Sequence, residues 1–386
     1  MIQTLQRRLL QQRADGLYRQ RRMVDSAQGP QLQLDGREVL AFCANDYLGL
    51  AADPRLAEAL CQATQHYGVG SGAAHLISGH SSAHHALEEE LADFLGTERA
   101  LLFSTGYMAN LGVLSALLGR GDTVFQDKLN HASLLDGAVL SQAKLRRYIH
   151  NDMASLQRLL EGAQGHCLLA SDGVFSMDGD IAPLGKLAAT ANAHKATLMI
   201  DDAHGFGVLG KQGRGSVQAA GLAQTQVPIY MATLGKALGV AGAFVAGPQE
   251  VIETLIQAAR SYVYTTAMPA ALAAASRRSL QIMAEEQWRR DQVQKLVALF
   301  RREAANIGLS LLPSVTPIQP IVLNSTEKAL QWSEALLAQG IWVSAIRPPT
   351  VPKGSARLRV TLSAAHTQAQ LERLLEALQQ LQQQDV

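Results

Sequence analysis

The run TLMIDDAHG, residues 197–205, decides the fold class of this 386-residue chain. A short apolar stretch leads directly into Asp201 and Asp202, as in a buried strand whose carboxyl end carries polar side chains. A second apolar stretch, 229–232, ends in the same way at Thr233. Because ligands gather outside the carboxyl ends of parallel strands in open α/β sheets, these stretches predict a binding site at one edge of a parallel sheet.

Short apolar strands and helices alternate on both sides of these two stretches. Further strands are expected over 100–103, 123–125, 167–170 and 243–246, and helices over 83–95 and 107–118. The alternation predicts an α/β fold with a mostly parallel sheet covered by helices.

The chain is long enough for more than one domain. Beyond residue 268 a long helical pattern runs toward Asn306, and shorter strands and helices then alternate, which is typical of a smaller α+β domain. We therefore expect an N-terminal helix and hairpin over 1–44, a large domain over 45–268 and a small C-terminal domain over 269–386.

The composition is that of an ordinary globular protein, with 47% apolar and 17% charged residues and a formal net charge of +1. No overall basic charge favours nucleic acid or an anionic membrane as a partner. No apolar run is long enough to cross a bilayer, and the first residues lack the apolar core of a secretory signal. Cys43, Cys61 and Cys167 lack the spacing of a zinc site and are expected to be reduced thiols. A cytoplasmic location is the expectation.

Lys236 lies in the run TLGKALG, residues 233–239, where glycines flank a lysine just after a predicted strand. A lysine amine forms an imine only when it can lose its proton, and a cleft with cationic neighbours lowers its pKa toward that condition. The glycines would let a flat ring approach the backbone. Standing alone, the motif is more often a surface lysine in a turn, so its meaning depends on the residues that accompany it.

Five other positions supply what a pyridoxal phosphate (PLP) site needs. A carboxylate such as Asp201 can hold a pyridinium nitrogen protonated, which makes the ring an electron sink, and His204 could reach the ring hydroxyl. Gly106 and Tyr107 begin a predicted helix, where backbone N–H groups bind phosphate, and Thr233 offers a hydroxyl. Each pattern alone has an ordinary structural explanation as a helix cap or a tight turn. Together with the lysine they predict a PLP enzyme.

Four further histidines divide into two cases. His131 follows the strand expected at 123–125, where an imidazole could stack on a planar ring. His80, His84 and His85 lie close together in the sequence, but we find no acid or thiol ligand to complete a metal site with them. We expect an exposed helix start at these histidines and no metal.

Taken together, the motifs resemble the α-oxoamine synthases, a branch of the fold-type I PLP enzymes with the architecture of aspartate aminotransferase. The resemblance covers almost the whole chain. Its most discriminating runs are NDYLGL at 45–50, GVFSMDGD at 173–180 and AIRPPTVP at 345–352. They resemble the members that condense L-alanine with pimeloyl-CoA or pimeloyl-acyl carrier protein, with loss of carbon dioxide, in biotin biosynthesis. The resemblance implies this reaction, PLP as cofactor and a homodimer.

The resemblance also implies roles for single residues. Lys236 would carry the cofactor as a Schiff base and shuttle a proton, with Asp201, His204 and His131 as the other catalytic residues. Cofactor contacts are implied for Gly106, Tyr107, His131, Ser176, Asp201, His204, Thr233 and Lys236. Substrate contacts are implied for Arg21, Asn45, His131, Thr350 and Arg359, and Arg19 and Arg22 are alternatives to Arg21.

Two other functions stay open. Glycine-using relatives, such as 2-amino-3-ketobutyrate CoA ligase and 5-aminolevulinate synthase, share the lysine and the cofactor, and the run RPPT at 347–350 is the reason for ranking them lower. A non-catalytic partner subunit would keep the fold, but it would be free to lose Lys236 or Asp201, and both are present.

Overall fold

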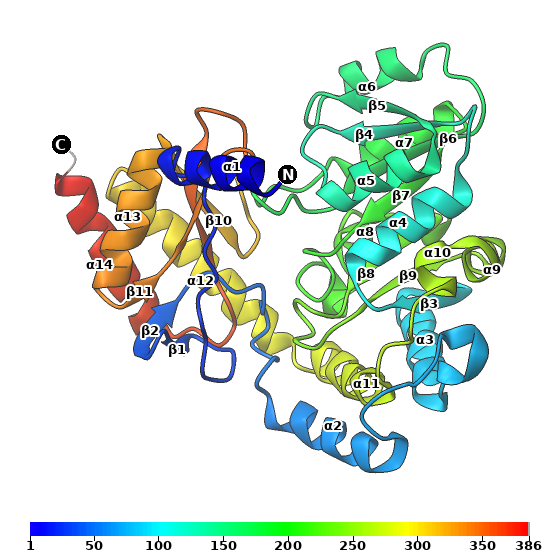
Figure 1. The fold of residues 1–386 in the computed structure, drawn as a ribbon, viewed down its shortest axis with the longest axis horizontal. Helices are drawn as coiled ribbons and strands as arrows, with labels where there is room; N and C mark the ends of the chain where they lie inside the picture. Colours follow the sequence, from blue (N-terminus) through cyan, green and yellow to red (C-terminus); the bar gives the residue numbers. More distant parts are fainter. Residues whose placement is uncertain (385–386) are drawn as a thin grey trace. The chain divides into compact units, whose positions relative to one another are not determined.

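A computed structural model describes residues 1–384 of the chain (Figure 1). Its contacts divide the chain into two compact units. The first contains residues 1–47, 177–180 and 291–386, and the second contains residues 48–176 and 181–290. None of the helices within residues 1–384 combines the length and the apolar composition that a membrane span requires.

The second unit is built on a seven-stranded sheet. Its order is β3 (Arg99–Phe103), β9 (Ala243–Gly247), β8 (Ile229–Thr233), β7 (Thr197–Asp201), β6 (Cys167–Asp172), β4 (Thr123–Asp127) and β5 (Lys144–Tyr148). The strands from β8 to β5 pair in parallel, and β9 pairs antiparallel with both of its neighbours. The expectation of an α/β fold with a mostly parallel sheet is therefore confirmed.

Helices cover this sheet because the strands are apolar on both faces. The helices of this unit are α2 (Pro54–Tyr67), α3 (Ser82–Leu95), α4 (Gly106–Leu117), α5 (Ala132–Ser141), α6 (Met153–Leu160), α7 (Leu184–Ala193), α8 (Ser216–Ala219), α9 (Gln249–Ala258), α10 (Arg260–Val263) and α11 (Ala270–Glu285), of which α2 packs on α11 rather than on the sheet. One core cluster joins Val113 of α4 and Leu134 of α5 to Met199 of β7, all completely buried. The sheet and the helices that carry the candidate site therefore share one core.

The first unit is a smaller α+β assembly. Its sheets are β10 (Ile318–Asn324), β13 (Ala356–Thr361) and β12 (Ser344–Ile346), and β1 (Gln31–Leu34), β2 (Arg37–Ala41) and β11 (Ile341–Trp342). Its helices are α1 (Ile2–Ala14), α12 (Gln287–Asn306), α13 (Thr326–Ala338) and α14 (Gln368–Gln384). A core that includes Phe42, Phe300 and Trp332 joins N-terminal and C-terminal residues in this unit.

The bounds of these units differ from those expected from the sequence. The expected boundaries follow residues 44 and 268. In the structure, residues 1–47 group with the C-terminal residues, and α11 groups with the seven-stranded sheet. The long helical pattern after residue 268 is two helices, α11 and α12, interrupted at Glu286. Because packing alone does not define a folding unit, the three-part division stays a prediction.

Replacing Leu114 by alanine tests the shared core of the second unit. Leu114 is completely buried on α4, so Leu114→Ala is expected to lower the free energy of unfolding by about 2–5 kcal/mol, measured by chemical denaturation at fixed PLP concentration. Leu140, on α5, is 58% exposed and serves as the control. Leu140→Ala should change the same quantity by less than about 0.5 kcal/mol. Equal effects of the two substitutions would contradict the packing described.

Candidate active site

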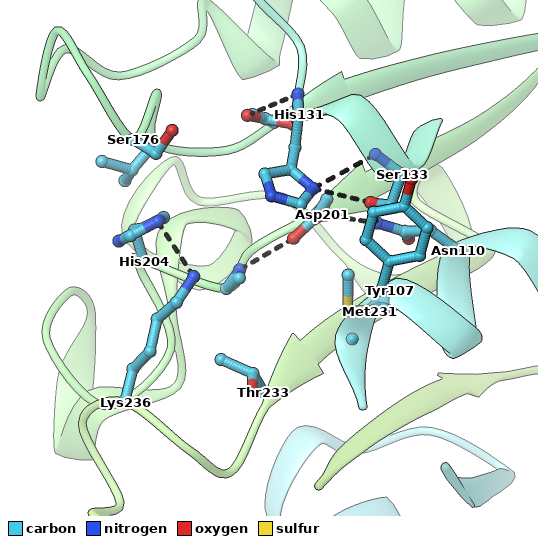
Figure 2. Close-up of a pocket in the computed structure, with 14 residues that line it drawn as sticks. Tyr107, Asn110, His131, Ser133, Ser176, Asp201, His204, Met231, Thr233 and Lys236 are labelled. Atoms are coloured by element: carbon cyan, nitrogen blue, oxygen red, sulfur yellow. Dashed lines mark hydrogen bonds between the residues drawn. The ribbon is translucent and has the colours of Figure 1, made fainter. Parts of the chain in front are cut away.

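A cavity of about 200 Å³ opens at the carboxyl ends of β6, β7 and β8, within the second unit. Fourteen residues line it: Gly106, Tyr107, Asn110, His131, Ser133, Asp172, Val174, Ser176, Asp201, Ala203, His204, Met231, Thr233 and Lys236. The eight positions expected to contact the cofactor are all among them. Figure 2 shows that these side chains come from several different elements and surround one space.

Lys236 enters the cavity from the turn that follows β8. Its Nζ atom lies 2.9 Å from His204 Nε2. The turn is tightly closed, because Gly239 N–H donates to Lys236 O at 2.8 Å and Val240 N–H donates to Leu234 O at 3.0 Å. Gly239 has a φ of 68°, a conformation that side chains with a Cβ rarely adopt. The glycine motif therefore fixes the backbone from which the lysine projects.

Asp201 is held in a fixed orientation at the end of β7. Asn110 Nδ2 donates to Asp201 Oδ2 at 2.6 Å, and Ala203 N–H donates to Asp201 Oδ1 at 3.1 Å. Asp201 is only 5% exposed. Both carboxylate oxygens therefore accept hydrogen bonds, which hold the carboxylate in a fixed orientation.

Asn110 is itself positioned by the close approach of two helices. A Cβ added at Gly137 of α5 would lie 2.7 Å from a side-chain carbon of Leu114 on α4, so only glycine fits this approach. The approach lets Asn110 Nδ2 donate also to Ser133 Oγ at 2.8 Å. Among the described residues, Asn110 Oδ1 is buried and has no hydrogen-bond partner.

The neighbouring acid, Asp202, does not line the cavity, although it lies at the same strand end. Its carboxylate accepts from Tyr230 Oη at 2.8 Å and from Ser216 N–H at 2.7 Å. Complete burial raises the pKa of Asp202 to about 6. Successive side chains of a strand point to opposite faces, which separates the roles of Asp201 and Asp202.

His131 lies at the N-cap of α5 and faces the cavity (Figure 2). Its Nδ1 accepts from Ser133 N–H at 3.3 Å, and its backbone N–H lies 3.2 Å from both carboxylate oxygens of Asp172. Desolvation lowers the pKa of His131, which favours the neutral imidazole. The pKa of Asp172 is raised well above its usual value, first by burial and then by Asp201.

An anion cradle is present at the start of α4. Gly106 and Tyr107 occupy the first turn, where N–H groups have no partner within the helix, and Thr105 caps the helix by accepting from Met108 N–H at 3.1 Å. Thr233 lies across the cavity, where its hydroxyl donates to Gly242 O at 2.9 Å. The helix N-terminus and its dipole suit a phosphate group.

The expected substrate residues other than His131 belong to the first unit. Both terminal nitrogens of Arg359 donate to Asn45 Oδ1 at 3.2 Å, and Arg359 is only 6% exposed. Thr350 Oγ1 accepts from Arg19 Nη2 at 3.3 Å. Arg21 is exposed. Of the three nearby arginines, Arg19 is thus the one whose side chain bonds to Thr350.

Six cavity residues were not expected from the sequence: Asn110, Ser133, Asp172, Val174, Ala203 and Met231. Asn110 carried a usable signal, because it is a polar residue within an apolar helix and lies one turn after Gly106. Ser133 and Asp172 gave no comparable signal, since serine and aspartate at helix starts and strand ends are common.

The sequence matches the family Aminotransferase class I and II over residues 37–378, and the chain belongs to this family. It is 58% identical over 374 residues to the 8-amino-7-oxononanoate synthase of Nitrosococcus oceani. The aligned region covers 97% of this chain and 99% of that relative. The resemblance to the α-oxoamine synthases is therefore confirmed, and the chain is an acyl-transferring enzyme of that branch.

Solved structures agree with this assignment. The serine palmitoyltransferase of S. paucimobilis, solved with bound PLP and myriocin, matches with a TM-score of 0.93 and 30% identity, over 98% of this chain and 97% of that one. The 8-amino-7-oxononanoate synthase of Francisella tularensis matches with a TM-score of 0.80 and 34% identity, over 90% of this chain and 98% of that one. The fold-type I architecture is thus confirmed, and PLP is the cofactor of this class of enzymes.

Replacing Asp202 by asparagine tests the buried acid beside the cavity. Burial raises the pKa of Asp202 from 3.8 to about 6, so the wild-type protein binds the proton more tightly when folded. The associated stability is present below pH 4 and is lost as the pH rises through 6. As the pH rises from 4 to above 6, the free energy of unfolding of the wild-type protein should fall by up to about 3 kcal/mol relative to that of the Asp202→Asn variant. Parallel stability profiles of the two proteins across this range would contradict the assignment.

Proposed function

We propose that the chain catalyses the condensation of L-alanine with a pimeloyl thioester, with loss of carbon dioxide, to give 8-amino-7-oxononanoate for biotin biosynthesis. The observation that carries the proposal is the convergence of Lys236, His204 and the hydrogen-bonded Asp201 on one cavity. The 58% identity to relatives of that name supports the choice of reaction.

The residues in the cavity fit PLP. The cavity offers a lysine amine, a carboxylate with fixed orientation, a flat imidazole and a helix N-terminus for a phosphate. When bound, PLP supplies an electron sink for the bonding electrons at the α-carbon of an amino acid. We assign Lys236 to the covalent link, Asp201 to the ring nitrogen, and His131 to stacking. Ring-hydroxyl and phosphate contacts are assigned to Ser176, His204, Gly106, Tyr107 and Thr233.

The protein groups account for proton movement. Lys236 Nζ removes the proton from the α-carbon of alanine and later returns one, as a positioned general base and acid. His204 Nε2, 2.9 Å from that nitrogen, fixes where the amine lies. Asp201 would hold the ring nitrogen of bound PLP in its protonated form, and hydrogen bonds from Asn110 and Ala203 fix the orientation of its two oxygens.

Substrate recognition is proposed residue by residue, from the resemblance to the α-oxoamine synthases. Arg359 and Asn45 are proposed to bind the α-carboxylate of alanine, for which a buried guanidinium is well suited. His131, Thr350 and Arg21 are proposed to contact the substrates, with Arg19 as the alternative to Arg21. The thioester carrier, a homodimer and a cytoplasmic location stay predictions.

A glycine-using or serine-using α-oxoamine synthase is the second candidate function. The match to a serine palmitoyltransferase with a TM-score of 0.93 favours it as far as the fold is concerned. This chain is 30% identical in sequence to that serine palmitoyltransferase and 58% identical to the 8-amino-7-oxononanoate synthase of Nitrosococcus oceani. A non-catalytic subunit is disfavoured, because Lys236, Asp201, His204 and His131 all line the same cavity.

The substrate assignment is tested by product analysis. The PLP-loaded protein is incubated with pimeloyl-CoA or pimeloyl-acyl carrier protein and with L-alanine, glycine or L-serine, and products are identified by mass spectrometry. We expect 8-amino-7-oxononanoate from alanine and a slower or absent reaction with the other amino acids. A product from glycine or serine alone would overturn the proposed substrate and keep the enzyme class.

The role of Lys236 is tested by substitution. Lys236→Ala should lower the turnover number with alanine by at least about 10²-fold, because a positioned general base contributes about 10²–10⁴. It should also abolish the visible absorbance of covalently linked PLP. Lys186, an exposed lysine on α7, provides the control, since Lys186→Ala should leave both quantities unchanged. Wild-type activity in Lys236→Ala would contradict the proposed mechanism.

A further inference from the structure

A group of histidines lies outside the active-site cavity, where a short π-helix over His75–Gly79 meets the start of α3. His75, His80, His84 and His85 gather there, and Glu88 lies near the middle of α3. None of these residues lines the active-site cavity. The cluster therefore needs an explanation apart from the proposed reaction.

His84 has a structural role that occupies both of its ring nitrogens. Its Nδ1 accepts from Ser81 N–H at 3.0 Å, which completes the cap of α3. Its Nε2 lies 2.7 Å from Met268 O and is therefore the protonated nitrogen. The lone pair of Nδ1 is already engaged by Ser81 N–H, so this imidazole has none free for a cation.

His80, His85 and Glu88 form a different set. Their candidate ligand atoms all lie within 4.8 Å of one another, and His80 Nε2 is 3.9 Å from Glu88 Oε2. His85 and Glu88 are separated by three residues on α3, so they share one face of the helix. A histidine and a glutamate at this spacing are a recurrent source of metal ligands on a helix. We expected no acidic ligand beside these histidines, and Glu88 corrects that expectation.

Glu88 is a fixed rather than a mobile ligand. Its Oε1 accepts from Leu102 N–H at 2.9 Å, which leaves Oε2 toward His80. Glu88 is only 9% exposed. A bound cation would compensate for the cost of the buried negative charge.

His80 is oriented by a neighbouring imidazole. Its Nδ1 lies 3.1 Å from His75 Nδ1, so one ring donates and the other accepts. The His75 ring stacks on Tyr262 with a centroid distance of 5.0 Å. When His80 Nδ1–H is the donor, the lone pair of its Nε2 faces Glu88. Metal-binding histidines are commonly oriented in this way, by a hydrogen bond from the second ring nitrogen.

We propose that His80, His85 and Glu88 bind a divalent transition metal ion such as Zn²⁺, with water in the remaining coordination position. Two imidazole nitrogens and one carboxylate oxygen suit zinc and its neighbours better than Mg²⁺ or Ca²⁺. Donors on one tetrahedral zinc lie about 3.3 Å apart, so His80 and Glu88 need to move by only a fraction of an ångström. His85 also contacts Glu89 at 3.3 Å, but both side chains are more than 60% exposed, and such a pair is easily exchanged. The ion would join the π-helix to α3.

The experiment is a zinc titration of the PLP-loaded, tag-free protein after removal of metals by chelation. Binding is followed by calorimetry, and bound zinc is counted by elemental analysis after dialysis. The ligand variants are His85→Ala, at an exposed position, and Glu88→Gln, which keeps the acceptor for Leu102 N–H. The matched control is His166→Ala, which removes an exposed histidine elsewhere in the second unit. His75→Phe keeps a ring against Tyr262 and removes the partner of His80.

We expect one zinc ion per chain in the wild type and in His166→Ala. His85→Ala and Glu88→Gln should each weaken binding by more than about tenfold, and His75→Phe by about 10-fold to 100-fold, as for other groups that orient a ligand. Circular dichroism spectra that match the wild type would show that the variants are folded. Absence of zinc binding to the wild type, or equal binding by the wild type and both ligand variants, would overturn the proposal.

Discussion

The hydrogen bond from Asn110 to Asp201, 2.6 Å long, is the constraint on which the rest of the candidate site depends. It joins the helix that carries the anion cradle to the strand end that carries the acid. If either Asn110 or Asp201 moved alone, a buried polar group would lose its hydrogen bond. An unsatisfied buried group costs about 1–3 kcal/mol of stability, and a charged group costs more. The same asparagine also reaches Ser133, beside His131. One amide thus sets the relative positions of three elements around the cavity.

Much of the fold could be predicted because the central parallel strands are mostly apolar. β6, β7 and β8 are short buried runs that end in polar residues, and their bounds lie close to those expected. β5 was missed because Lys144–Tyr148 is an edge strand with charged side chains and little burial. The grouping of residues 1–47 with the C-terminal half depends on contacts between residues far apart in sequence, which local patterns do not contain.

The site was predictable where its chemistry leaves a local motif. Lys236 between glycines and Asp201 before His204 have short signatures, and the structure brings them together. Asn110 and Ser133 have none of comparable strength, because their function depends on how α4 and α5 approach at Gly137. Glu88 was overlooked for a related reason. Its distance from His80 becomes apparent only when the π-helix and the start of α3 are placed together.

The central claim is that Lys236, and no other lysine, carries the cofactor. The most direct measurement is borohydride reduction of the PLP-loaded protein, followed by proteolysis and mass mapping of the labelled peptide. The account predicts a single label on Lys236, within the peptide that follows β8. A label on a different lysine, or no covalent label in a protein that binds PLP, would contradict it.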